Sequence, residues 1–214
     1  MRRIVSTVML ISFLAIAHAS AIVAGQQYQV LPANLPSLDT SAQSNQVVVT
    51  EFFSFACPHC FEEQPYLNAW LKTKPKNVVF QRIPVGFDNP QWVPLAKAYY
   101  VIQALGKTET LMPSIFNAIH VNNQPLFTED AIAQFCANYG IDPATFKQYY
   151  ESFSINEELR ECDQLAQTYG ILGVPSVVVG NQYLTDVGQA GGKPQLITVV
   201  QQLVTQLQGL QTTS

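Results

Sequence analysis

The chain has 214 residues and a formal net charge of −4, with 48% hydrophobic and 12% charged residues. The excess of acidic over basic residues argues against nucleic acid or an anionic lipid surface as the partner. The length suffices for one well-buried core with room for an inserted subdomain.

The first residues have the pattern of an export signal. Arg2 and Arg3 precede an apolar run over residues 4–17, and small residues follow it. The run is shorter than the roughly 20 residues that cross a bilayer, and the small residues fit a cleavage site. We therefore expect residues 1–21 to be a signal peptide, cleaved between 19 and 25, that directs the protein to an oxidising compartment.

The first strong element of the mature chain is an apolar, β-branched strand over residues 47–53. Its near-continuous apolar character is typical of a central strand that is buried on both faces. A short edge strand near residues 28–30 is expected before it. Glu51 interrupts the run, and its type alone leaves open an exposed carboxylate or a buried acid. A second strand is expected over residues 77–83.

A Cys-x-x-Cys motif, Cys57-Pro58-His59-Cys60, follows that strand and begins a helix that should run to about residue 72. Two cysteines at this spacing on a first helical turn can close a small disulfide ring. The first sulfur faces the unpaired N–H groups and the positive end of the helix, which favour a thiolate. Because a thiolate is the species that attacks disulfides, the motif indicates redox chemistry.

Residues 88–168 have a helical pattern, and five helices are expected there. Thr128 begins an N-terminal signal for the third helix, and Asp142 is a cap for the fourth. Ser154 opens a capping box for the fifth. A helical block between two strand-forming segments predicts an inserted helical subdomain.

The C-terminal part returns to strands. Pro175 precedes a strand over residues 177–179, and a helix over residues 194–207 ends the pattern. An X–Pro peptide bond is normally trans, and sequence alone predicts a trans bond here. Residues 26–87 and 169–214 are thus expected to form one α/β domain with a mixed sheet, interrupted by the helical block.

The remaining cysteines, Cys136 and Cys162, lie far from the motif and from each other. A zinc site of four cysteines would need a second close pair, so we expect no metal. Three alternatives remain for these two: buried thiols, a structural disulfide or a second redox pair. The even number of cysteines in an exported chain favours a Cys136–Cys162 disulfide.

Residues 52–60, Phe-Phe-Ser-Phe-Ala-Cys-Pro-His-Cys, resemble the active site of the DsbA family of periplasmic thiol–disulfide oxidoreductases in the thioredoxin superfamily. The resemblance covers the mature chain, and its specific motifs are residues 47–67 and 170–187. It implies a thioredoxin-like mixed sheet with an inserted helical subdomain, and no cofactor. Proline and histidine between the cysteines are associated with the strong oxidants of that family.

The resemblance also implies roles for the motif residues. Cys57 would be the exposed sulfur that forms the mixed disulfide with a client protein, and Cys60 would be the buried resolving thiol. His59 would supply a donor or a positive charge to the Cys57 thiolate, and Pro58 would rigidify the turn.

Further roles follow from positions that match the family outside the motif. The Val174–Pro175 bond would be cis, in a loop that lies against the disulfide and holds the backbone of the client. Glu51 would be a buried acid that moves protons to or from Cys60, and Arg82 would be its basic partner.

The function that the resemblance implies is oxidation of cysteine pairs in exported proteins as they fold in the periplasm. The protein would be a monomer, reoxidised by a membrane partner of the DsbB type. A disulfide isomerase or reductase is the first alternative, although isomerases of the DsbC and DsbG type add a dimerisation domain. A non-redox peptide-binding chaperone is the second, and it would remain active after Cys57→Ser.

Overall fold

The computed structural model describes residues 21–39, 42–43 and 45–211. The predicted signal peptide over residues 1–21 lies outside the described residues, apart from residue 21. None of the described helices is long and apolar enough to cross a membrane. The elements are β1 Gln29–Val30, β2 Val47–Phe53, α1 Pro58–Leu71, β3 Val78–Pro84, α2 Val93–Ala104, α3 Thr108–His120, α4 Glu129–Ala137, α5 Pro143–Tyr150, α6 Phe153–Thr168, β4 Ser176–Val179, β5 Tyr183–Asp186, α7 Val187–Ala190 and α8 Lys193–Gln211.

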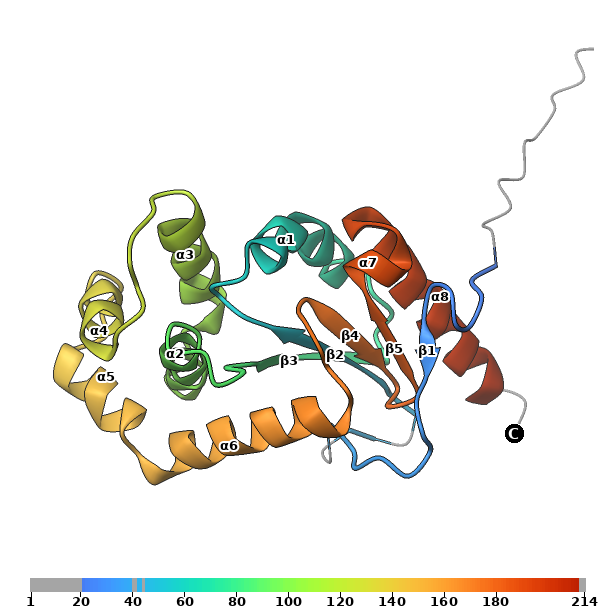
Figure 1. The fold of residues 1–214 in the computed structure, drawn as a ribbon, viewed down its shortest axis with the longest axis horizontal. Helices are drawn as coiled ribbons and strands as arrows, with labels where there is room; N and C mark the ends of the chain where they lie inside the picture. Colours follow the sequence, from blue (N-terminus) through green and yellow to red (C-terminus); the bar gives the residue numbers. More distant parts are fainter. Residues whose placement is uncertain (1–20, 40–41, 44, 212–214) are drawn as a thin grey trace, which may run out of the picture.

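The strands form one mixed sheet in the order β1-β5-β4-β2-β3 (Figure 1). Strand β2 is parallel to β3 and antiparallel to β4, and the other pairs are antiparallel. All residues of β2 are buried, as its near-continuous apolar sequence predicted. The register places Glu51 of β2 beside Arg82 of β3. The predicted α/β fold, a mixed sheet with a helical insertion, is confirmed.

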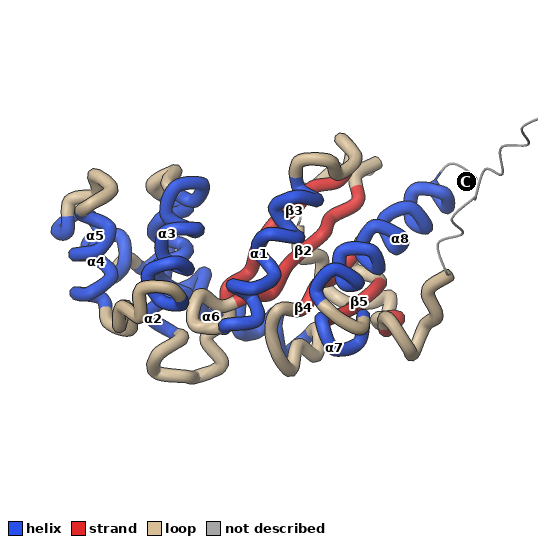
Figure 2. The backbone as a smooth tube through the Cα atoms, turned by 90° about the horizontal axis from the view of Figure 1, so that it is seen from above, coloured by secondary structure: helices blue, strands red, loops and turns tan. Residues whose placement is uncertain are grey.

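Helices cover both faces of the sheet. Helices α1 and α8 lie on one face, where Val49 of β2 packs in the same cluster as Leu67 of α1 (Figures 1 and 2). Helix α6 lies along the other face, where Phe52 shares a cluster with Ala166. Since side chains alternate along a strand, Glu51 points to the same face as Val49, beneath α1.

The helical insertion packs beside the sheet around a core of its own that also includes Phe53 and Phe55 of the active-site segment. Helices α4 and α5 begin at polar caps: the side chains of Thr128 and Asp142 each accept a hydrogen bond from the backbone N–H three residues later. The predicted cap at Ser154 is wrong by two residues. Ser152 has the extended backbone of an N-cap, whereas Ser154 already lies in the first turn of α6.

The predicted disulfide between Cys136 and Cys162 is contradicted by the structure, in which both are free, buried thiols. Cys136 on α4 packs in the core of the insertion, whereas Cys162 on α6 packs against the sheet. The two side chains therefore lie in different parts of the core. Burial raises the pKa of each to about 12, so both stay protonated and unreactive at neutral pH.

Candidate active site

The Cys-x-x-Cys motif lies where β2 ends and α1 begins. Cys57 is the N-cap residue of α1, with extended backbone, and Pro58 occupies the first helical position. Proline fits there because its missing N–H would be unpaired in any residue. The expectation that Cys57 is exposed is wrong, because it is only 5% exposed. Cys60 lies three residues further on the buried face of the helix, and both cysteines are free thiols in the structure. The arrangement is that of a reduced dithiol with one sulfur at a helix N-terminus.

The surroundings of the two sulfurs shift the pKa values of Cys57 and Cys60 in opposite directions. The pKa of Cys57 falls to about 6, mainly because the Cys60 thiol donates a hydrogen bond to it, assisted by the backbone N–H groups of Cys60 and His59. Burial works in the opposite direction but is outweighed. Burial and the neighbouring Cys57 raise the pKa of Cys60 well above its ordinary value. At neutral pH the site therefore holds a Cys57 thiolate next to a Cys60 thiol.

His59 contributes less to this acidity than its position suggests. Its side chain is 67% exposed and its Nδ1 lies 3.5 Å from a carboxylate oxygen of Glu62. Its charge is the last of the causes that lower the pKa of Cys57, behind its own backbone N–H. The helix terminus and Cys60 are therefore the main source of the thiolate.

The loop before β4 lies against Cys57. The Val174–Pro175 peptide bond is cis, as the resemblance implied and contrary to the ordinary preference for trans. The carbonyl oxygen of Val174 lies 3.3 Å from the Cys57 sulfur and accepts its hydrogen bond when the thiol is protonated. Leu172, two residues earlier, is 98% exposed. The backbone of this loop thus lies against the reactive sulfur, and an exposed apolar side chain precedes that contact by two residues.

The expected pair of Glu51 and Arg82 is present beneath α1. The Nε–H of Arg82 donates to a carboxylate oxygen of Glu51 at 2.6 Å, and Glu51 is fully buried. Burial raises the pKa of Glu51, and the guanidinium opposes that rise. Gln64 accepts from Arg82 at 3.4 Å and donates to the carbonyl oxygen of Cys60 at 3.1 Å. The charged pair is therefore linked to the helix turn that carries Cys60.

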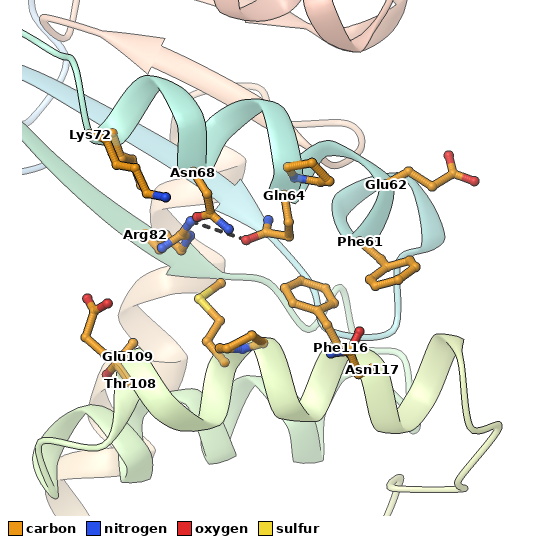
Figure 3. Close-up of a pocket in the computed structure, with 14 residues that line it drawn as sticks. Phe61, Glu62, Gln64, Asn68, Lys72, Arg82, Thr108, Glu109, Phe116 and Asn117 are labelled. Carbon is orange, nitrogen blue, oxygen red and sulfur yellow. Dashed lines mark hydrogen bonds between the residues drawn. The ribbon is translucent and has the colours of Figure 1, made fainter.

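Arg82 also borders a groove of about 690 Å³ between α1 and α3. Figure 3 shows the guanidinium of Arg82 beside Gln64, with Asn68 further along α1 and Lys72 just after its last residue. Phe61 and Phe116 lie at the other end of the groove. The groove connects the ion pair to solvent. Arg82 reaches water there, whereas Glu51 does not.

A second buried carboxyl, Glu63, was missed by the sequence reasoning. It is fully buried on α1, and its pKa rises to about 9 because of burial and the nearby Glu51. The signal that could have found it is periodicity: Cys60, Glu63 and Leu67 recur at the spacing of one helix face.

Comparisons with known proteins agree with this geometry. The family model of the DSBA-like thioredoxin domain matches residues 48–203. The chain belongs to the DsbA family. The expected family and enzyme class, thiol:disulfide oxidoreductase, are thereby confirmed.

Relatives in the DsbA family match most of the chain. The thiol:disulfide interchange protein DsbA of Burkholderia cepacia is 37% identical over 97% of this chain and 98% of its own length. That of Azotobacter vinelandii is 35% identical over 85% of this chain and 83% of its own. The crystal structure of Pseudomonas aeruginosa DsbA has a TM-score of 0.81 at 28% identity, covering 89% of this chain and 97% of that one.

We expect the stability of the reduced protein, relative to the oxidised protein, to rise with pH between about 6 and 8.5. The pKa of Cys57 is about 6 in the folded protein, whereas an unfolded cysteine titrates near about 8.5. Because the folded pKa is the lower one, the stabilisation is complete above 8.5 and is lost as the pH falls through 6. The difference corresponds to about 3 kcal/mol in the free energy of unfolding, of which about 1 kcal/mol is present at pH 7.

Urea unfolding of both redox forms at about pH 5, 7 and 9 measures this change. Reduced Cys57→Ser is the control, because it has no Cys57 thiolate and should lack the rise in stability between pH 5 and pH 7. If the reduced and oxidised wild-type proteins change in parallel with pH, Cys57 is not a stabilised thiolate.

Proposed function

We propose that this protein donates the Cys57–Cys60 disulfide to pairs of cysteine thiols in exported proteins as they fold. The observation that carries the proposal is the opposite shift of the two acidities. A Cys57 thiolate stabilised by the fold favours the reduced form of the pair, which makes the disulfide form a better oxidant.

The exchange proceeds in two displacements. A client thiolate attacks the Cys57 sulfur, a client–Cys57 disulfide forms, and the Cys57–Cys60 bond breaks with its electron pair on Cys60. Burial makes the Cys60 thiolate unfavourable, so that sulfur takes up a proton. The second client thiolate then attacks the client sulfur of the mixed disulfide, and Cys57 leaves as the stabilised thiolate. The client loses two electrons and the enzyme gains them.

The other residues at the site would position these reactants. Pro58 begins the helix that stabilises the Cys57 thiolate, and His59 adds its backbone N–H. Val174 and Pro175 would hold the client backbone against Cys57, supported by the short distance between the Val174 carbonyl and that sulfur. Leu172 offers an exposed apolar contact, which suits a client that is not yet folded.

We further propose the cellular context that the sequence predicted. Residues 1–21 would direct the protein to the periplasm, where a membrane partner of the DsbB type would reoxidise it. It would act as a monomer. Its thioredoxin-like parts would be residues 26–87 and 169–214, with the helical subdomain over residues 88–168.

The test is oxidation of a reduced two-cysteine peptide by one equivalent of the purified, oxidised mature protein. Titration of free thiols should show loss of both peptide thiols with wild type and no acceleration with Cys57→Ser. Cys136→Ala is the matched control, because it removes a buried thiol away from the site and should match wild type. Wild type no faster than Cys57→Ser would overturn the proposal.

A further inference from the structure

Glu63 is a buried acidic residue that has no role in the exchange reaction. It lies on the face of α1 that packs on the sheet, one helical turn after Cys60. Its side chain is fully buried, and neither carboxylate oxygen has a hydrogen-bond partner among the described residues. A buried carboxylate without a donor is strongly disfavoured, whereas a neutral carboxyl is tolerated there.

The charged groups around Glu63 come from each element packed near it. Glu51 on β2 and Cys57 at the start of α1 disfavour its ionisation, while Arg82 on β3 and Lys193 on α8 favour it. Both cations are already engaged. Arg82 donates to Glu51, and the Nζ of Lys193 lies 2.7 Å from a carboxylate oxygen of Glu62.

Only one of these charges changes with the redox state of the site. Cys57 is a thiolate in the reduced protein and carries no charge when it is bonded to Cys60. Glu51, Arg82 and Lys193 take no part in the bond that forms or breaks. The negative charge next to Glu63 therefore increases on reduction, and a proton on Glu63 becomes more favourable.

We propose that Glu63 is a proton-binding site whose occupancy is coupled to the redox state of Cys57 and Cys60. Reduction breaks the disulfide, adds two electrons, protonates Cys60 and leaves Cys57 as a thiolate. In the pH range where Glu63 is ionised in the oxidised protein but neutral in the reduced protein, reduction also draws one proton from solvent onto its carboxyl. The coupling is reciprocal, so the neutral carboxyl favours the reduced pair. This proposal rests on the proposed disulfide exchange at Cys57 and Cys60. It does not depend on which clients react or on whether the protein oxidises or reduces them.

The coupling has a definite sign with pH. At low pH Glu63 is neutral in both redox forms and does not affect their balance. As the pH rises, the oxidised form loses this proton first, and the reduced form loses it near 9. Reduction of the wild-type protein should therefore become less favourable with rising pH more steeply than reduction of Glu63→Gln, which has no proton to bind.

The first experiment is an NMR titration of both redox forms of the mature protein, with its glutamate side-chain carboxyl carbons labelled with ¹³C. One resonance should titrate near 9 in the reduced form and at lower pH in the oxidised form, and Glu63→Gln should lack it. Glu109→Gln, an exposed residue on α3, should keep it. If no glutamate resonance of the wild-type protein titrates above pH 7, the proposal is overturned, whether or not Glu63→Gln folds.

The second experiment measures the equilibrium constant with glutathione between pH 6 and 10. The ratio of the wild-type constant for reduction to that of Glu63→Gln should fall roughly tenfold, as a tenfold difference in the proton affinity of Glu63 between redox forms would give. A constant ratio would overturn the coupling. The glutathione equilibrium requires only a Cys57–Cys60 disulfide, so it can succeed even if the client peptide is not oxidised.

Discussion

Arg82→Met is expected to lower the free energy of unfolding by about 3–5 kcal/mol at pH 8. Glu51 is fully buried, and Arg82 donates to one of its oxygens at 2.6 Å. The other oxygen has no hydrogen-bond partner in the described part of the chain. Removing Arg82 thus leaves a buried carboxylate with neither a counter-charge nor a donor, and such a group cannot recover its hydration.

The loss should become smaller as the pH falls toward 5. Burial already raises the pKa of Glu51, and removal of the guanidinium raises it further. A carboxyl with a raised folded pKa holds a proton that the unfolded chain releases, so its stability is lost as the pH rises. Urea unfolding of wild type and Arg82→Met at about pH 5 and 8 measures this difference.

Two further variants separate charge from packing. Glu51→Gln leaves Arg82 at the groove, where its guanidinium reaches water, so a smaller loss of about 1 kcal/mol is expected. The double variant Glu51→Leu with Arg82→Met removes both charges and should lie within about 1 kcal/mol of wild type. If it is as unstable as Arg82→Met alone, the contact of Arg82 with the Phe80 ring stabilises this region instead.

The residues of the site differ in how far sequence could predict them. Cys57 and Cys60 needed only local geometry, because a strand followed by a helix start places one sulfur at the N-terminus and the other one turn inside. The cis bond before Pro175 required the resemblance, since an isolated X–Pro bond predicts trans. The pairing of Glu51 with Arg82 depends on the register of β2 with β3, which neither strand specifies alone.

Apart from the start of α6, which was predicted two residues late, the errors concern which face of a helix is buried. Cys136 and Cys162 lie in the predicted helical block, but their separation in sequence does not reveal that α4 and α6 turn them into different parts of the core. Glu63 is the opposite case, because its charge suggested the surface while its spacing from Cys60 and Leu67 specified burial. An acidic residue that shares the spacing of the buried face of a helix therefore indicates a buried carboxyl group.

Glu63→Gln is expected to stabilise the protein relative to wild type by an amount that grows with pH. An unfolded glutamate titrates near about 4.3, whereas folded Glu63 titrates near 9. Between these values the folded protein holds a proton that the unfolded chain has lost, so wild-type stability falls by about 1.4 kcal/mol per pH unit. Glutamine has no such proton. The difference in free energy of unfolding between Glu63→Gln and wild type should therefore shift by about 4 kcal/mol in favour of the variant from pH 5 to pH 8.

The slope with pH is the measure, because the glutamine amide enters the same unpartnered environment at a cost that does not depend on pH. Urea unfolding at about pH 5, 6.5 and 8 gives the slope for each protein. Glu62→Gln is the matched control one residue away. Glu62 is half-exposed and paired with Lys193, which lowers its pKa. The stabilisation from that pair is therefore already present above the unfolded pKa of about 4.3, and Glu62→Gln should run parallel to wild type from pH 5 to pH 8. If Glu63→Gln and wild type instead run parallel, Glu63 is ionised in the folded protein, and the proton that we couple to the redox state is absent.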